Sequence, residues 1–223
     1  MTSDQSLEAA IEQQEQRVAA AMENLREEIR AYRQMADAPP KSLKDGEAKL
    51  LNGEMLQETQ LYANRFQMMR DLAVAGRGAE VGVQTGNFSR FLLDEIKATH
   101  LFLYDLNTDL TRQDVLDDPR TTMLVGDSST NLAQAEDQSF DWIYIDGDHR
   151  EVGVRKDIAA ARQKIKPDGL LIFNDYTPWS AGEVMPYGVM PPVNDLINEG
   201  YPVAGVALAH HGYFDIAVRY IPL

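Results

Sequence analysis

The segment "DWIYIDGDHR", residues 141–150, passes from an apolar run directly into side chains that can move protons or bind cations. Gly147 lets the chain turn after Asp146, so His149 follows just beyond the end of the expected strand. An imidazole titrates near neutral pH and can act as a general base beside a carboxylate. We therefore expect Asp146 and His149 to be catalytic, whereas Asp148 is expected only to cap the next helix or complete an Asp-Gly turn.

Two further polar residues, Asn174 and Asp175, end the apolar run "GLLIFND" at residues 169–175. The carboxyl ends of parallel strands lie at one edge of a sheet, so these residues are expected near Asp146. Two carboxylates and an amide, in a chain without cysteine, are donors that suit Mg²⁺ better than Zn²⁺. The pattern predicts a magnesium site made by Asp146, Asn174 and Asp175.

A glycine loop, "AEVGVQTGNFS" at residues 79–89, leads from a strand into a helix that begins near Asn87. Backbone N–H groups and a helix N-terminus there could bind a nucleotide or a carboxylate. The spacing of Gly82 and Gly86 is neither that of dinucleotide enzymes nor that of the lysine-bearing phosphate loop, which disfavours pyrophosphate and NAD. The alternative is that both glycines only permit a tight turn.

Two more strand ends carry acids. Asp105 ends the second strand, where doubly wound folds place the acceptor for ribose hydroxyls. In "GDSST" Asp127 follows the third strand and could accept from an exocyclic amine. The alternatives are a strand-terminal turn for Asp105 and a helix cap made by Asp127 or Ser128.

The elements that must position these residues alternate between strands and helices. Apolar strands are expected at residues 78–83, 99–105, 121–126, 140–146 and 169–175, and helices at 87–97, 128–136 and 150–166. This alternation predicts an α/β, doubly wound, Rossmann-like sheet that is mostly parallel and buried on both faces. Two β-rich runs around "HHG" predict a C-terminal hairpin that adds an antiparallel edge strand, with His210 and His211 in its turn.

The N-terminal segment has a helical pattern instead of alternating strands and helices. Residues 4–36 lack Gly and Pro and space their apolar residues three and four apart, which predicts a long amphipathic helix that ends in "DAPPKSLKDG". One or two further helices are expected from about residue 48. We expect an N-terminal extension, residues 1–45, and a catalytic domain, residues 46–223. The apolar stripe could pack on the chain itself or pair with a second copy as a homo-oligomer such as a dimer.

Composition excludes several classes of protein. The formal charge of −14 disfavours nucleic acid as a partner, and the absence of cysteine excludes disulfides and thiolate catalysis. No apolar run approaches the ~20 residues that span a bilayer, and no targeting signal is recognisable. We expect no membrane partner and a cytoplasmic location.

These motifs, together with "YIDGDH" and "KPDGLLIFNDY", resemble class I S-adenosylmethionine-dependent methyltransferases from about residue 79 onward. The most specific part resembles the subgroup of macrolide-sugar O-methyltransferases and cephalosporin-hydroxylase-like proteins. The resemblance implies that the cofactor's methionine portion, ribose and adenine contact three groups of residues in turn: Glu80, Gly82, Gly86 and Ser89; Asp105; and Asp127 with Ser128. It also implies Mg²⁺ at Asp146, Asn174 and Asp175, although sugar-modifying relatives usually carry an acid in place of Asn174.

The function expected from this resemblance is methyl transfer from S-adenosylmethionine to a hydroxyl of a small molecule, assisted by Mg²⁺, with His149 as the general base. The Pro/Gly-rich segment at residues 177–192 is expected to cover the acceptor, or else to be a connection packed on the core. The alternative function is a cofactor-binding accessory or oligomerisation protein that uses the same fold without turnover.

Overall fold

The structure is a computed structural model that describes residues 3–35, 48–182, 185–209 and 212–221. It divides into two compact units, Met1–Lys44 and Asp45–Leu223. The described part of the first unit is one helix, α1 (Ser3–Met35), as the apolar spacing predicts. The expected helix stop at residues 37–46 lies outside the described residues. Among the described helices, none combines the length and apolar character needed to cross a membrane.

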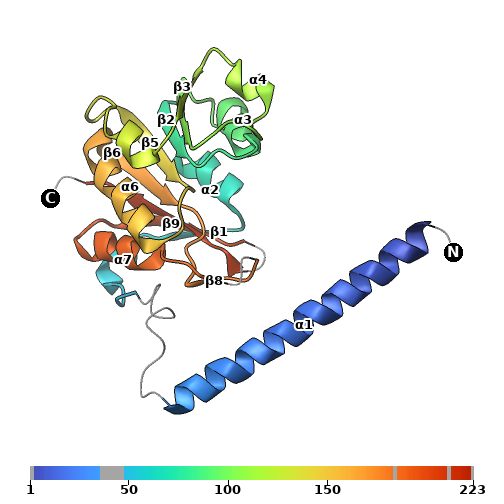
Figure 1. The fold of residues 1–223 in the computed structure, drawn as a ribbon. Coiled ribbons are helices and arrows are strands. Elements are labelled where there is room, and N and C mark those ends of the chain that lie inside the picture. The colour runs from blue at the N-terminus through green and yellow to red at the C-terminus, as the bar shows by residue number, and fades with distance from the viewer. Residues whose placement is uncertain (1–2, 36–47, 183–184, 210–211, 222–223) are drawn as a thin grey trace. The chain divides into compact units, whose positions relative to one another are not determined.

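The second unit is built on an eight-stranded sheet with the order β1-β9-β10-β6-β5-β2-β3-β4 (Figure 1). β2, β3, β4, β5 and β6 run parallel, whereas β10 is antiparallel to both of its neighbours. The expected doubly wound, mostly parallel fold is confirmed. The strands are β1 (Gln60–Tyr62), β2 (Arg77–Val81), β3 (His100–Asp105), β4 (Thr121–Val125), β5 (Phe140–Ile145), β6 (Ile165–Phe173), β9 (Val203–Ala207) and β10 (Asp215–Arg219).

Helices cover both faces of this sheet because its central strands are apolar on both sides. On β5, Ile143 and Ile145 belong to one core cluster, while Trp142 and Tyr144 belong to the other. The first cluster includes residues of α5 (Ser128–Leu132), α6 (Glu151–Lys164) and α7 (Met190–Asn198). The second includes residues of α2 (Arg65–Leu72), α3 (Asn87–Asp94) and α4 (Gln113–Leu116).

Three local predictions differ from the structure. β10 is antiparallel but is not the edge strand, because β9 continues past it and β1 then pairs with β9. The stretch expected to be only helical after residue 48 holds the short 3₁₀ helix η2 (Gly53–Leu56) and strand β1 before α2. The segment at residues 177–192 contains a small two-stranded sheet, β7 (Trp179–Ser180) with β8 (Met185–Pro186). Strands of two or three residues are too short to show an alternating pattern.

Candidate functional site

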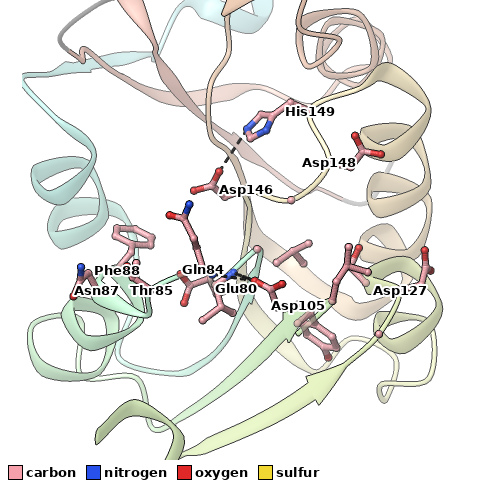
Figure 2. Close-up of a pocket in the computed structure, with 18 of the residues that line it drawn as sticks. Glu80, Gln84, Thr85, Asn87, Phe88, Asp105, Asp127, Asp146, Asp148 and His149 are labelled. Carbon is pink, nitrogen blue, oxygen red and sulfur yellow. Dashed lines mark hydrogen bonds and ion pairs between the residues drawn. The ribbon is translucent and has the colours of Figure 1, made fainter. Parts of the chain in front are cut away.

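A pocket of about 780 Å³ lies over the carboxyl ends of β2, β3, β4 and β5. Pockets of this size accommodate cofactor-sized ligands. Figure 2 shows acidic side chains from several strand ends around it, with His149 beyond Asp146. Seven of the predicted site residues line it: Glu80, Gly82, Asp105, Asp127, Ser128, Asp146 and His149. The other four, Gly86, Ser89, Asn174 and Asp175, are not among its described lining residues.

Backbone hydrogen bonds continue the sheet register beyond the strand ends. Gly82 N–H donates to Tyr104 C=O at 2.8 Å, Asp146 N–H to Val81 C=O at 2.7 Å, and Asn174 N–H to Ile145 C=O at 3.0 Å. These bonds bring the glycine loop, Asp146 and Asn174 to one edge of the sheet, as expected for parallel strands.

Gly82 is required by this arrangement for two reasons. Its φ of +84° lies in the left-handed region, which a residue with a side chain rarely adopts. In addition, a Cβ at this position would lie 1.9 Å from the carbonyl oxygen of Asp146. The close approach of the loop to β5 therefore depends on glycine.

Asp105 supports the glycine loop. Its Oδ2 accepts hydrogen bonds from the backbone N–H groups of Val83 at 2.8 Å and Gln84 at 2.9 Å (Figure 2). Its Oδ1 lies 3.4 Å from the N–H of Asn107. A carboxylate has further acceptor positions beyond these bonds, so Asp105 keeps acceptor capacity on the pocket side.

Glu80 and Ser89 form a buried pair beneath the loop. The Ser89 hydroxyl donates to Oε2 of Glu80 at 2.6 Å, and both side chains are almost fully buried. Burial, with a smaller contribution from Asp146 and Asp105, raises the pKa of Glu80 to about 8, against the hydrogen bond from Ser89. Gly86 precedes α3 with a φ of +74°. Ser89 and Gly86 thus act on the pocket through Glu80 and the backbone.

Asp127 and Ser128 lie at the start of α5. Asp127 caps this helix by accepting from Thr130 N–H and the Ser129 hydroxyl, each at 2.8 Å, and these bonds lower its pKa to about 2. The capping alternative therefore describes Asp127 in this structure. The Ser128 hydroxyl donates at 2.7 Å to Asp157 of α6, whose pKa burial raises to about 6. Asp157 was not identified from the sequence.

His149 lies between two carboxylates. Its Nε2 is buried and lies 3.5 Å from Oδ1 of Asp146 and 3.6 Å from Oδ2 of Asp175. Burial lowers the pKa of His149, but Asp146, Asp175 and Asn174 raise it by more, so the net pKa lies above its ordinary value. Tyr187 stacks on the imidazole at 4.6 Å with an interplanar angle of 12°.

Asp148 lies apart from this group. It accepts from the guanidinium of Arg150 at 2.7–3.1 Å and from the Arg150 backbone N–H at 3.0 Å. These contacts are those of a turn, as the second expectation for Asp148 had it; the expected helix cap is wrong, because α6 begins after Arg150 without a side-chain cap hydrogen bond.

The proposed metal ligands converge only in part. Asp146 and Asp175 both lie near His149, and Nδ2 of Asn174 donates to Asp215, so the amide oxygen of Asn174 faces away from Asp215; the Asn174 side chain also interacts with His149. In the part of the chain that the structure describes, no three His, Cys, Asp or Glu side chains form a metal-binding group. Two carboxylates and an amide oxygen nevertheless fit a hard cation such as Mg²⁺ in their chemistry.

Besides Asp157, three residues of the site were not identified from the sequence. Arg65 lines the pocket and lies over the ring of Phe88 at 4.6 Å, and the hydroxyl of Tyr144 and the carboxylate of Asp215 form a buried pair behind it. Only Asp215 had a recognisable signal, an acid inside the otherwise apolar stretch "YFDIAV". His210 and His211 lie outside the described residues.

Comparison with known proteins finds one matching family model and several solved structures with a similar fold. Residues 79–176 match the family model described as "Methyltransferase domain". The solved structure of the N-methyltransferase NodS from Bradyrhizobium japonicum has a TM-score of 0.53 and 16% identity, over 71% of this chain and 95% of that one. The pyocyanin biosynthetic protein PhzM has a TM-score of 0.50 and 17% identity, over 69% of this chain and 53% of that one. No curated protein matches in sequence.

Proposed function

Since residues 79–176 belong to the methyltransferase domain family, in a unit with the class I S-adenosylmethionine-dependent methyltransferase fold, we propose that the protein transfers a methyl group to a hydroxyl of a small molecule. The observation that carries the hydroxyl assignment is His149, whose buried Nε2 lies between two carboxylates at the end of the pocket. A base in this position has a use when the acceptor must lose a proton.

The pocket supports S-adenosylmethionine as the cofactor. Gly82 allows the loop to pack against the backbone that follows β5, Glu80 lies beneath the loop, and Asp105 presents an acceptor at the end of β3. We assign the methionine portion to the loop side, the ribose to Asp105, and the adenine to the side of Asp127 and Ser128. When bound, S-adenosylmethionine would supply an electrophilic methyl group on its sulfonium.

The chain's own residues would position the acceptor and receive its proton. His149 accepts the hydroxyl proton at Nε2, and Asp146 and Asp175 stabilise the imidazolium that results. Mg²⁺, held by Asp146, Asp175 and the amide oxygen of Asn174, would lower the pKa of the hydroxyl. Holding both reactants in line supplies much of the remaining rate acceleration.

The acceptor is expected beside residues 177–182 and 185–189. Tyr187 stacks on His149, the Gly188 N–H donates to the His149 carbonyl at 2.7 Å, and Tyr213 accepts from Gly182 N–H at 2.8 Å. Trp179 is 37% exposed and offers an aromatic surface to an acceptor.

The test of this function is a calorimetric titration of S-adenosylmethionine into the folded protein with Mg²⁺ present. Binding at micromolar strength is expected, followed by methylation of a compound in a panel of small hydroxylated molecules. No binding to protein with an intact circular dichroism spectrum would contradict the proposal, because the glycine loop would then be only a turn.

The same titration gives a prediction for Glu80. Its raised pKa of about 8 leaves it largely protonated at pH 7.5 in the free protein, and the cofactor's positive charges favour the carboxylate form. Binding is therefore expected to release part of a proton near neutral pH. Titrations in two buffers of different ionisation enthalpy measure this release, and Glu80→Gln should abolish it. Equal apparent enthalpies in both buffers would contradict the prediction.

We also propose that α1 pairs with a second copy of the chain. Its apolar stripe, formed by Leu7, Ile11, Val18, Met22 and Leu25, is 41–61% exposed. Light scattering is expected to give twice the monomer mass for the wild type and the monomer mass for Val18→Asp/Leu25→Asp. The control Gln13→Asp/Gln16→Asp changes the opposite side of the helix and should leave the dimer intact. A monomeric wild type would contradict the proposal.

A further inference from the structure

The amide group of Asn174 is held by a buried polar network behind the site. Asn174 is 8% exposed, and its Nδ2 donates to Oδ1 of Asp215 at 3.2 Å and lies 3.4 Å from the hydroxyl oxygen of Tyr144. Asp215 is the first residue of β10 and is 2% exposed. A buried carboxylate of this kind requires hydrogen-bond donors around it.

The protons of this network have defined places. Tyr144 donates to Oδ2 of Asp215 at 2.5 Å, so the tyrosine oxygen accepts from its other neighbours, including Nη1 of Arg65 at 3.2 Å. Both carboxyl oxygens of Asp215 therefore act as acceptors, Oδ2 from Tyr144 and Oδ1 from Asn174. If the Asn174 amide were reversed, its oxygen would face the Asp215 oxygen without a proton between them, which is costly in a buried position.

This orientation determines which atom of the Asn174 amide faces away from Asp215. With Nδ2 facing Asp215, the carbonyl oxygen Oδ1 lies at the other end of the amide. The Asn174 side chain also interacts with His149, which itself lies 3.5 Å from Asp146 and 3.6 Å from Asp175. The end of the amide that faces away from Asp215 is therefore an oxygen, which can act as a cation ligand, rather than an N–H group.

We propose that Asp215 is a positioning residue: with Tyr144 and Arg65 behind it, it fixes Asn174 so that the amide oxygen completes a divalent-cation site with Asp146 and Asp175. This inference rests on the proposed function, and it assigns a role to a residue of β10, outside residues 79–176 that match the methyltransferase family. Groups that orient metal ligands typically affect metal affinity by about 10–100-fold.

The experiment measures Mn²⁺ affinity by electron paramagnetic resonance, with Mn²⁺ as a probe for Mg²⁺. Asp215→Asn keeps the size of the side chain but lets either end of the new amide face Asn174. Its Mn²⁺ affinity is expected to fall about 10–100-fold, with S-adenosylmethionine affinity unchanged.

A swapped variant separates orientation from general packing. In Asn174→Asp/Asp215→Asn the carboxylate at position 174 can accept from the amide at 215 and still present its second oxygen to the cation. Mn²⁺ affinity should return to within a few-fold of the wild type. Failure of the swap to restore binding, or an Asp215→Asn variant that binds Mn²⁺ normally, would overturn the proposal.

The outcomes also separate this inference from the proposed function. Wild-type protein that binds S-adenosylmethionine but no Mn²⁺ would overturn the positioning role toward a cation and leave the cofactor assignment standing. Protein that binds Mn²⁺ with the expected response to Asp215→Asn, but no S-adenosylmethionine, would support the positioning role and contradict the cofactor assignment. Loss of S-adenosylmethionine and Mn²⁺ binding together in Asp215→Asn would indicate a structural role and would contradict the proposal.

Discussion

Replacing His149 by alanine is expected to lower kcat about 10²–10⁴-fold on an identified hydroxyl acceptor, the usual contribution of a positioned general base. The variant removes the group that receives the proton, while the glycine loop, Glu80 and Asp105 remain. S-adenosylmethionine affinity should therefore change little. Calorimetry for the cofactor and initial rates of methyl transfer measure the two effects separately.

The matched control is His100→Ala. His100 lies on β3, where its Nε2 is 2.8 Å from the hydroxyl of Thr122, and it does not line the pocket. This variant is expected to keep the wild-type kcat. Full turnover by His149→Ala would contradict the assignment of His149 as the general base, since another group would then have to accept the proton.

The second large effect is expected for Gly82→Ala. The alanine Cβ would lie 1.9 Å from the Asp146 carbonyl oxygen at a φ of +84°, so the loop or β5 must move. Such overpacking costs about 1–3 kcal/mol of unfolding free energy. Movement of the loop should also weaken S-adenosylmethionine binding by at least about tenfold, which corresponds to 1.4 kcal/mol. Urea unfolding and calorimetry measure the two losses.

The variant Gly212→Ala separates the two causes of destabilisation, which are the steric clash of the added Cβ and the backbone strain of a positive φ. Gly212 has a similar φ of +79°, but an added Cβ would meet nothing within 4 Å. Its substitution costs only the backbone strain of about 1–2 kcal/mol. Gly82→Ala is expected to be the more destabilising of the two. Equal unfolding free energies and unchanged cofactor binding would mean that the loop tolerates a side chain.

The fold was predictable wherever long patterns specify an element. Five apolar runs become β2 to β6, and the uninterrupted amphipathic pattern becomes α1, because burial of a strand or of a helix face constrains many residues together. The placement of β10 inside the sheet was not predictable, because it depends on the pairing of β1 with β9 between distant segments. No local pattern encodes a pairing of that kind.

The site was predictable where function coincides with a strand end. Asp146 and His149 follow β5 in one loop, and Asp175 comes near His149 because the parallel strands β5 and β6 end at one edge. The roles of Asp105 and Asp127 toward backbone N–H groups depend on the geometry of loops, which the sequence indicated only as alternatives. Arg65 and Asp215 come from opposite ends of the domain, and only the folded sheet brings both to Tyr144.

The attachment of residues 185–189 to the loop that carries His149 has a consequence for changing the acceptor. Gly188 packs so closely that a Cβ there would lie 2.1 Å from the backbone nitrogen of Glu151, and Tyr187 covers the imidazole. Exchange of this segment between enzymes would therefore also alter the position of the imidazole. Acceptor range is expected to change together with turnover in this protein, rather than independently of it.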